Sequence, residues 1–382
     1  MTSGSNKRVV ILQRVLPHYR IPFVSRLRQT LAESGFDLRL IYGQEKRGSL
    51  PATVELDEPW ALRITNRYLP TPAGEFVWQP CWRHLPHADL LIVEQANRLL
   101  INYLLQWYWR REGRVLAYWG HGRDFQAGDR NGVSARLRSL MNSRVDWWFA
   151  YTRLSAAIVA ADGFPRERIS IVGNSIDTNA LKRTIAAVNA GQIRALREQL
   201  RLEAGPVALY CGGLYPEKKI AYLLEAAGRL RQRIEHFNLI LVGSGPEESA
   251  VGRAAAGCSW IHHIGADYGV QRAVCFALSD VMLMPGAVGL AIVDSFAAGV
   301  PLFTTDTPGH GPEIAYLESG GNGVMTSPAV EEYVATVAWY LAAPERLAML
   351  RQGCQASAER ITLEAMTRNF SAGIMAALAR RA

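Results

Sequence analysis

The sequence predicts an α/β protein with two doubly wound domains in series, each built on a parallel sheet. Three observations lead to this fold class. The chain has 382 residues, more than a single hydrophobic core usually organises. Short apolar runs alternate with amphipathic stretches of helical period, which is typical of parallel strands joined by crossover helices. This alternation is interrupted by a polar, Ala- and Arg-rich stretch at residues 181–200 and then begins again.

The first half contains apolar runs of strand length that are separated by predicted helices. The predicted strands are residues 7–13, 36–42, 88–94, 114–120, 146–152 and 168–173, and the predicted helices are residues 21–35, 97–111 and 154–163. Near-continuous apolar runs fit strands that are covered by helices on both faces of a sheet.

The second half repeats this pattern. The predicted strands are residues 206–213, 237–245, 259–265, 280–286 and 300–305, the predicted helices are residues 220–234, 270–278 and 291–298, and residues 330–382 are predicted to be helical throughout. We therefore expect an N-terminal domain at residues 1–170, a second domain at residues 171–355, and a C-terminal helix at residues 356–382 that could pack back on the first domain.

Composition narrows the class of protein further. Because 49% of the residues are hydrophobic and 20% are charged, a disordered or low-complexity scaffold is excluded. No apolar run reaches the about 18 residues of a spanning helix, and the N-terminus lacks an export pattern. The five scattered cysteines argue against a disulfide framework and a zinc site. A cytoplasmic protein fits these features best.

The positive charge of the chain is concentrated in its first half. Residues 1–170 carry 24 Lys and Arg against 15 Asp and Glu, a net charge of +9, and the remainder carries 18 against 19, a net charge of −1. This asymmetry predicts an anionic partner for the first domain: a membrane surface, a polyphosphate or a nucleic acid.

Two glycine-containing segments follow strands and precede helices in the second domain. In the first, Gly212 and Gly213 are followed by Lys218 and Lys219, so that backbone amides and fixed positive charge suit a diphosphate. A surface turn with solvated lysines explains the segment about as well. In the second, residues 284–290 open a helix, and a carboxylate at Asp294 could accept hydrogen bonds from a ribose or could merely favour the positive end of that helix.

These two segments, with LVGSGP at residues 241–246 and GNSID at residues 173–177, resemble the signature series of GT-B glycosyltransferases of the retaining family four. EIAYLESGGNG at residues 313–323 resembles the Glu, helix, Asn-Gly pattern of the same family. The resemblance covers roughly residues 171–325, and the first domain resembles the family only in layout. It implies two Rossmann-like domains that face a cleft, and a nucleotide-activated sugar bound mainly by the second domain.

The resemblance assigns roles to individual residues. Lys218 matches the diphosphate-binding lysine, Asp294 the acidic residue that bonds the ribose, and Gly289 and Leu290 the loop whose amides meet the phosphates and the sugar. His121 resembles the active-site histidine near the donor sugar. In a retaining transfer, this histidine would hold the sugar while positioning and charge stabilisation lower the barrier. From chemistry alone, a histidine between glycines is more often a loop or core residue.

Two positions depart from the family pattern. Gly213 stands where a phosphate-binding arginine usually lies, and Gly286 replaces the first glutamate of the acidic pair, which usually contacts sugar hydroxyls. Lys219, Arg20 or Arg123 could supply the charge missing at Gly213.

Two features of the first domain bear on the acceptor. Arg20 belongs to a loop, PHYRIP at residues 17–22, that could contact the acceptor or a phosphate, although a helix start with Pro22 in its first turn is the simpler reading. Aromatic and basic residues interleave at residues 102–114, so this helix could lie on an anionic membrane, or could be a core helix with a basic end. Together with the charge asymmetry, these features favour an acceptor that is a glycan or is linked to a polyprenyl diphosphate, at the inner face of a membrane.

Several other functions are disfavoured. The sequence has no Asp-x-Asp or His-x3-His spacing, and His262 and His263 would face opposite ways on a strand, so we expect no metal site. We also expect no cofactor beyond the nucleotide sugar. A sugar-nucleotide epimerase or hydrolase of the same architecture is the alternative enzyme. A nucleic-acid-binding module is disfavoured because the arginines are dispersed and form no recognition motif.

Overall fold

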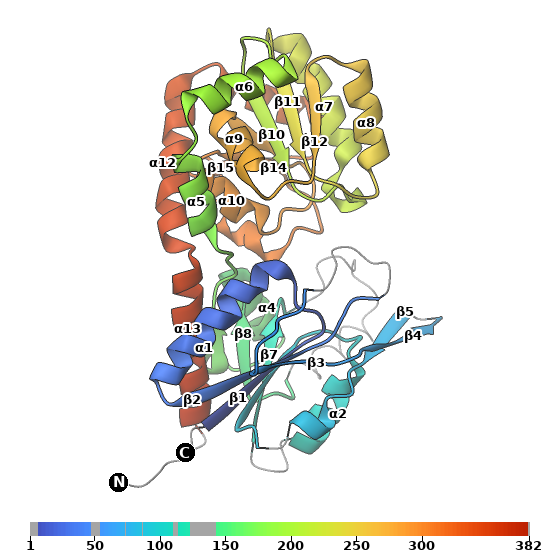
Figure 1. The fold of residues 1–382 in the computed structure, drawn as a ribbon, viewed down its shortest axis with the longest axis vertical. Coiled ribbons are helices and arrows are strands. Elements are labelled where there is room, and N and C mark those ends of the chain that lie inside the picture. The colour runs from blue at the N-terminus through green and yellow to red at the C-terminus, as the bar shows by residue number, and fades with distance from the viewer. Residues whose placement is uncertain are drawn as a thin grey trace. The chain divides into compact units, whose positions relative to one another are not determined.

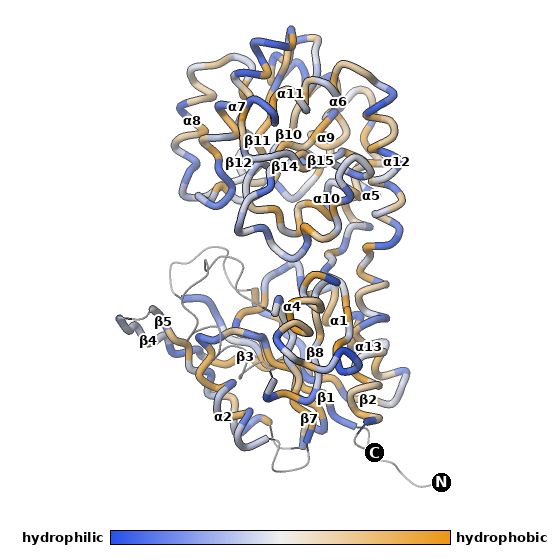
Figure 2. Tube along the Cα trace, turned by 180° about the vertical axis from the view of Figure 1, so that it is seen from behind, coloured by the Kyte–Doolittle hydropathy of each residue, from blue (hydrophilic) through white to orange (hydrophobic). Residues whose placement is uncertain are grey.

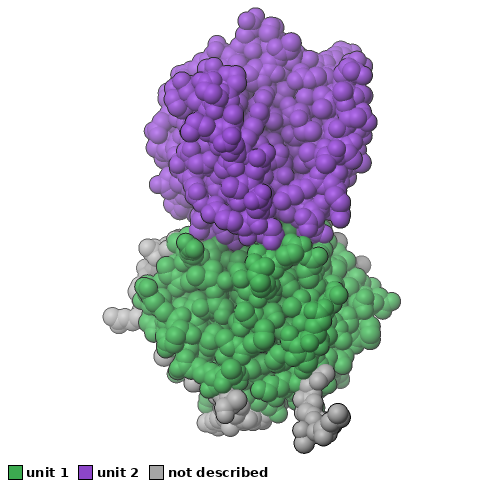
Figure 3. Space-filling view, turned by 90° about the vertical axis from the view of Figure 1, so that its left-hand side faces the viewer, with its two compact units in different colours: residues 1–176, 363–382 green, residues 177–362 purple. Residues whose placement is uncertain are grey.

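The computed structural model describes residues 7–46, 54–72, 74–85, 87–109, 114–122 and 143–380. The chain forms two compact units: unit 1 is Met1–Ile176 with Leu363–Ala382, and unit 2 is Asp177–Thr362 (Figure 3). Each unit is built around an all-parallel sheet with helices between the strands, so the predicted two-domain, Rossmann-like architecture is confirmed (Figure 1).

The elements among the described residues of unit 1 are as follows. The strands are β1 (Lys7–Gln13), β2 (Phe36–Tyr42), β3 (Ala61–Arg63), β4 (Arg67–Thr71), β5 (Gly74–Trp78), β6 (Leu90–Glu94), β7 (Val115–Gly120), β8 (Trp147–Ala150) and β9 (Ile169–Ile171). The helices are α1 (Ile21–Glu33), α2 (Leu100–Tyr108), α4 (Arg153–Ala161) and α13 (Leu363–Ala379), with short 3-10 turns η1 (His18–Arg20), η2 (Trp82–His84) and η4 (Arg166–Arg168).

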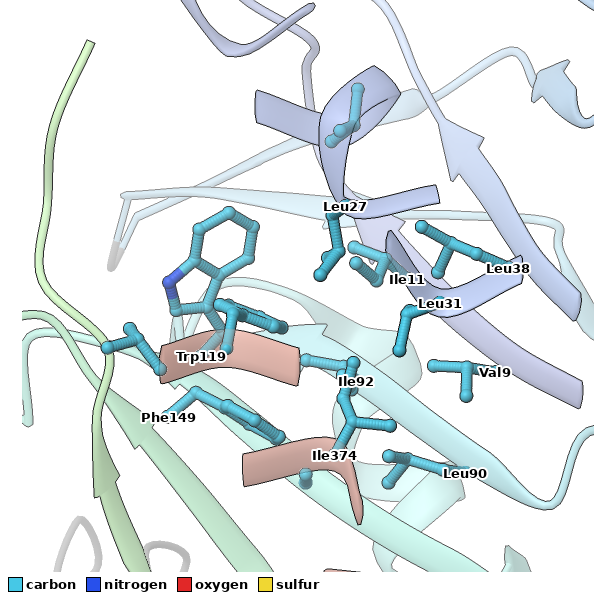
Figure 4. Packing of buried hydrophobic residues seen from close by; sticks show 14 of the residues in the cluster. Val9, Ile11, Leu27, Leu31, Leu38, Leu90, Ile92, Trp119, Phe149 and Ile374 are labelled. Carbon is cyan, nitrogen blue, oxygen red and sulfur yellow. The ribbon is translucent and has the colours of Figure 1, made fainter. Parts of the chain in front are cut away.

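The sheet of unit 1 has the strand order β3-β2-β1-β6-β7-β8-β9 and separates two hydrophobic cores. Alternate residues of β1 point to opposite faces: Val9 packs with α1 and α13, and Val10 packs with α2 and α4. Figure 4 shows the first of these cores, and Figure 2 shows hydrophobic residues gathered along the central strands. Burial on both faces explains why these strands are continuous apolar runs in the sequence.

The C-terminal helix α13 belongs to unit 1. Phe370 stacks on Phe149 of β8 with ring centroids 4.5 Å apart. A Cβ at Gly373 would lie 2.6 Å from the Ser170 hydroxyl oxygen, so the helix can approach β8 and β9 closely only with glycine at this position. The borders of the units differ from those expected from sequence, because residue 170 lies inside β9 at the edge of the first sheet and residue 355 lies inside α12 of unit 2.

The elements of unit 2 are as follows. The strands are β10 (Val207–Cys211), β11 (Asn238–Val242), β12 (Ile261–Gly265), β13 (Val281–Leu283), β14 (Leu302–Thr305) and β15 (Gly323–Thr326). The helices are α5 (Thr178–Ala186), α6 (Ala190–Leu200), α7 (Ile220–Arg233), α8 (Glu248–Gly257), α9 (Val270–Leu278), α10 (Ala291–Ala298), α11 (Val330–Leu341) and α12 (Pro344–Arg360), with 3-10 turns η5 (Pro216–Lys218) and η6 (Pro312–Tyr316).

The sheet of unit 2 has the strand order β12-β11-β10-β13-β14-β15. The chain leaves β10 toward β11 and later returns past it to β13, so the direction of winding reverses between these two neighbours. Right-handed crossovers therefore place α7 and α8 on one face and α9 and α10 on the other. In such sheets ligands bind at the carboxyl ends of the strands on either side of this reversal.

Most of the predicted elements are present, and the differences have local causes. The polar stretch at residues 181–200 is two helices, because Asn189 caps α6 through a capping box with Gln192. The predicted helix at residues 97–111 is found as α2, which begins at Leu100. The strands β3 and β15, the hairpin β4–β5 and the helix α8 were not predicted. None of the described helices is both long and apolar enough to span a bilayer.

Candidate functional site

Three loops meet at the carboxyl edge of the second sheet: residues 212–219 after β10, 243–247 after β11 and 284–290 after β13. The loops after β10 and β11 are joined backbone to backbone. The Leu214 amide donates to the Ser244 carbonyl at 2.9 Å. A Cβ at Gly243 would lie 1.9 Å from the Gly212 carbonyl oxygen, and Gly245 has a φ of +156°, so both positions require glycine. The glycines of LVGSGP therefore shape the edge on which the other loops rest.

Lys218 lies at the centre of this edge. Its ammonium group donates a hydrogen bond to the Ala287 carbonyl at 2.5 Å, and the Ala287 amide donates to the Glu217 carbonyl at 2.8 Å. Burial lowers the pKa of Lys218, and the carboxylates of Glu217 and Glu313 oppose this effect. The turn η5 and the loop after β13 thus hold the lysine from two sides, and its positive charge lies where these two loops contact each other.

Gly286 is required by this contact. A Cβ at position 286 would lie 2.3 Å from the Lys218 carbonyl carbon and 2.4 Å from the Glu217 carbonyl oxygen. Real Cβ atoms do not approach backbone atoms this closely, so the glutamate that the family usually has at this position cannot be accommodated here.

Gly213 is also covered by a neighbour. A Cβ at this position would lie 2.4 Å from the Tyr215 ring, and the Tyr210 hydroxyl donates to the Gly213 carbonyl at 2.6 Å. The aromatic ring of Tyr215 therefore occupies the space that an arginine side chain at position 213 would need. Lys219 follows in a left-handed conformation with a φ of 54°, and it separates η5 from α7.

Gly289 and Leu290 lie where the loop after β13 becomes α10. No atom lies within 4 Å of a Cβ built at Gly289, so this part of the loop is open. Leu290 is the N-cap residue of α10 and gives no side-chain hydrogen bond to the helix start. Amide groups at such a helix start can bind an anion.

His310 fixes this loop from the side of β14. Its Nδ1 accepts a hydrogen bond from the Val288 amide at 3.0 Å, and its Nε2 lies 2.8 Å from the Thr305 carbonyl oxygen. These partners require a neutral imidazole with its hydrogen on Nε2. Burial lowers the pKa of His310, and the nearby positive charges of Lys218 and Lys219 act in the same direction.

Asp294 lies in the first turn of α10 and is paired with an arginine that belongs to none of the sequence motifs. The Arg272 guanidinium, on α9, bonds the Asp294 carboxylate, and its Nε donates to the Cys211 sulfur at 3.4 Å. Only 14% of the Asp294 side chain and 16% of the Arg272 side chain are exposed. Burial raises the pKa of Asp294, and Arg272 opposes this rise.

The remaining predicted residues belong to unit 1. His121 follows β7, and its ring lies 4.7 Å from that of Tyr151. Arg20 is buried: its guanidinium donates to the Asn174 side-chain oxygen at 2.6 Å and lies 5.0 Å from the Trp119 ring. Helix α1 begins at Ile21 with a proline in its first turn, as the simpler reading of this loop predicted.

Unit 2 thus brings Lys218, Gly289 and Leu290 to one edge of its sheet, with Asp294 in the adjoining helix turn. Arg123 lies outside the described residues. Within the described parts of the chain, no group of three or more His, Cys, Asp or Glu side chains is placed to hold a metal ion.

Three residues that shape this edge were not predicted from the sequence: Arg272, His310 and Tyr215. Only the three-dimensional contacts reveal them, since they act on loops distant in sequence or take the place of another side chain.

The sequence of unit 2 matches known proteins. Residues 205–343 match the family model described as Glycosyl transferases group 1. Over 138 residues the chain is 28% identical to the GDP-mannose-dependent alpha-(1-6)-phosphatidylinositol monomannoside mannosyltransferase of Mycobacterium tuberculosis, a match that covers 33% of this chain and 36% of that protein. The protein of the same description from Mycolicibacterium smegmatis is 27% identical over 168 residues, with 41% and 44% of the two chains covered. The matches therefore span less than half of the length of these relatives.

Solved structures resemble the whole chain. HepE of Anabaena in complex with UDP has a TM-score of 0.69 at 17% identity and covers 97% of this chain and 99% of its own. WaaG, a glycosyltransferase involved in lipopolysaccharide biosynthesis, has a TM-score of 0.62 at 14% identity, with 95% and 98% covered. The fold is that of a GT-B protein with two Rossmann-like units. Unit 2 carries the region, residues 205–343, that resembles the group 1 glycosyl transferases.

Proposed function

We propose that the protein is a glycosyltransferase that moves a sugar from a nucleoside diphosphate to an acceptor. The observation that carries this proposal is the placement of the Lys218 ammonium and the start of α10 at one edge of the sheet, with Asp294 in the first turn of that helix. The lysine and the amides suit the diphosphate, and the carboxylate suits the ribose hydroxyls. The donor is the only small molecule that the proposal requires.

A UDP- or GDP-linked sugar is the proposed donor. One structural neighbour is described in complex with UDP-glucose, and the mycobacterial relatives are described as GDP-mannose-dependent. Thermal unfolding of the full chain with UDP, GDP and ADP tests this proposal. A ligand present at 100 times its Kd stabilises the native state by about 2.7 kcal/mol. Stabilisation by UDP or GDP is expected, and stabilisation by neither of these two nucleotides would refute the proposed donor.

We propose net retention of configuration at the transferred sugar. Lys218 and the amides of Gly289 and Leu290 would stabilise the charge that develops on the departing diphosphate, which lowers the barrier to transfer. His121 would hold the donor sugar rather than remove a proton. His121→Ala should therefore reduce kcat more than donor affinity, as measured by turnover and by titration with the nucleotide. A larger loss of donor affinity than of kcat would make His121 a plain binding residue.

An epimerase or hydrolase of the same architecture is less well supported. Such chemistry needs carboxylates placed as acid and base at the sugar. Position 286, where the family usually has a glutamate, is a glycine with no room for a side chain. The family match is to transferases.

The proposed acceptor is a glycan or a polyprenyl-diphosphate-linked sugar, as in the assembly of a surface polysaccharide or glycolipid. The excess positive charge of the first unit supports an anionic acceptor or an anionic membrane surface. An exposed aromatic cluster on α2 and η2 supports a membrane surface: the Trp107 side chain is 55% exposed, and the rings of Trp82 and Tyr108 lie 5.6 Å apart. Trp82 precedes β6 and Tyr108 precedes β7, so the cluster lies at the opposite edge of the sheet from His121.

The membrane proposal has its own test. Co-sedimentation with vesicles that contain about a third anionic lipid should retain the wild-type protein and release the Trp107→Ser variant. The Trp339→Ser variant is the matched control, because Trp339 is a similarly exposed tryptophan of unit 2, at 53%. Equal retention of all three proteins would show that the cluster is not a membrane contact.

A further inference from the structure

Arg272 is a largely buried charge of unit 2 to which the proposed function gives no role. Its guanidinium bonds Asp294 on α10 and the sulfur of Cys211, the last residue of β10. It also lies over the Phe276 ring, with its central carbon 5.4 Å from the ring centroid. Arg272 therefore connects two helix starts and the end of a central strand, at the sheet edge where the donor is proposed to bind.

The backbone at Arg272 is held as firmly as its side chain. The Asp267 carboxylate accepts hydrogen bonds from the amides of Gly269 and Arg272, at 2.9 Å and 2.8 Å, and so fixes the first turn of α9. A guanidinium presented from a fixed turn has little freedom, so it can impose one orientation on the carboxylate that it bonds.

Asp294 depends on this one partner. Among the described residues, Arg272 is the group that gives the Asp294 side chain a hydrogen bond, and it is also the charge that opposes the effect of burial on the Asp294 pKa. Other titratable or charged groups lie on the elements next to α10 and on the adjacent strand end. They are Cys211 on β10, Asp267 before α9, Lys182 and Arg183 on α5, Glu313 and Tyr316 on η6, and Glu345, Arg346, Arg351, Cys354, Glu359 and Arg360 on α12.

We propose that Arg272 is a positioning residue that keeps the Asp294 carboxylate charged and oriented to accept the ribose hydroxyls of the donor. The inference rests on the proposed function, since it concerns the same donor site. Arg272 bonds one carboxylate oxygen, Oδ2, so the carboxylate can accept the ribose through its other oxygen. A carboxylic acid accepts a hydrogen bond less well than a carboxylate, so loss of the arginine should weaken binding most at low pH.

A second arginine pair serves as the structural comparison. Arg231 bonds Glu203 at 2.7 Å and donates to the Phe237 carbonyl at 3.0 Å. Glu203 precedes β10 and Phe237 precedes β11, so this pair lies at the amino edge of the same sheet, away from the proposed donor site. Arg231→Leu therefore removes an arginine–carboxylate pair of the same unit that lies away from the proposed donor site.

The test measures affinity for UDP and GDP by calorimetric titration of the full chain between about pH 6 and about pH 8.5. The variants are Arg272→Leu, Arg272→Lys, Asp294→Asn and the double variant, with Arg231→Leu as the control. Each affinity is divided by the wild-type value at the same pH, which cancels the titration of the nucleotide itself. Thermal unfolding of each variant reports folding separately.

For Arg272→Leu we expect a loss of affinity of roughly tenfold at neutral pH that deepens as the pH falls. Arg272→Lys should restore part of the affinity and flatten the pH profile, because it restores the charge. Asp294→Asn should weaken binding at every pH, and adding Arg272→Leu to it should cost little more. If Arg272→Leu does not fold, the lysine variant and the Asp294→Asn variant still decide the question.

The outcomes separate the two proposals. If the wild-type protein binds neither UDP nor GDP, the proposed function itself fails. If it binds one of them, and Arg272→Leu matches the Arg231→Leu control in affinity and pH profile, Arg272 is only a structural residue. Fully additive effects of Arg272→Leu and Asp294→Asn would likewise overturn the inference, because the arginine would then act without the carboxylate.

Discussion

Replacing Lys218 by Met tests the proposed diphosphate site most directly. The Lys218 ammonium donates to the Ala287 carbonyl at 2.5 Å, and burial lowers its pKa while two nearby carboxylates oppose that effect. Methionine keeps an unbranched side chain of similar length and removes both the charge and the hydrogen-bond donors. The perturbation therefore leaves the packing of the loop nearly unchanged.

The expected magnitude follows from these contacts. A hydrogen bond between a charged donor and a phosphate oxygen contributes about 1.5–3 kcal/mol, which corresponds to nucleotide binding that is about 10- to 150-fold weaker. The variant also loses its bond to the Ala287 carbonyl, which costs about 1 kcal/mol, but it no longer buries an ammonium group. These two effects oppose each other, so we expect the free energy of unfolding to change by no more than about 1 kcal/mol.

Titration with UDP and GDP measures the affinity, and denaturant unfolding measures the stability. Lys182→Met is the matched control, because the Lys182 ammonium donates to the Ala358 carbonyl at 3.2 Å in the same unit but lies on α5. Wild-type affinity in the Lys218→Met protein would refute the assignment of the diphosphate to this edge. Equal losses in both variants would point to a general loss of stability.

Three further predictions concern the loops at this edge. Gly286→Ala would place a Cβ 2.3 Å from a backbone carbon of η5, so it should lower the free energy of unfolding by about 1–3 kcal/mol in denaturant titrations. Gly289→Ala is the control: no atom lies within 4 Å of a Cβ at this position, so its free energy of unfolding should stay at the wild-type value. Gly213→Arg alone should lower the melting temperature, and adding Tyr215→Ala should restore part of it, because this change removes the ring that lies 2.4 Å from a Cβ at position 213. Thermal unfolding of the single and the double variant measures this, and equal melting temperatures of the two would contradict the prediction. Burial lowers the pKa of His310, so below about pH 6.5 the unfolded chain binds a proton that the folded chain does not. The free energy of unfolding should therefore fall as the pH falls, and His310→Asn should make this pH dependence less steep. An unchanged pH dependence in the variant would refute a neutral, buried His310.

Much of the fold could be predicted because its central strands are buried on both faces. The strands β1 and β2 and the helices α9 and α10 have the bounds expected from sequence. The missed elements carry weaker signals. Strand β4, RYLPT, contains a proline and is mostly exposed, and in α8 only Val251 is buried. Short or exposed elements take their structure from contacts made elsewhere in the chain, which a local pattern does not record.

The candidate site could be predicted in part, for a related reason. Lys218 and Gly289 stand in glycine-rich strand ends whose chemistry is visible locally. Arg272 and His310 act through contacts with α10 and with the loop after β13, from positions 22 residues away in sequence. Nothing in their own neighbourhood indicates these contacts, so only the packing of the crossover helices and loops brings them to the site.

The two departures from the family pattern belong to one local arrangement. Because Gly286 has no side chain, the loop after β13 can lie against the backbone of η5, and this approach brings the Ala287 carbonyl within 2.5 Å of the Lys218 ammonium. Beside it, the Tyr215 ring covers Gly213. A glutamate or an arginine restored alone would meet backbone or ring atoms, so neither change can return the family's contacts without moving a loop. If the donor binds here as proposed, positive charge and amide groups, rather than a carboxylate at position 286, would recognise it at this edge.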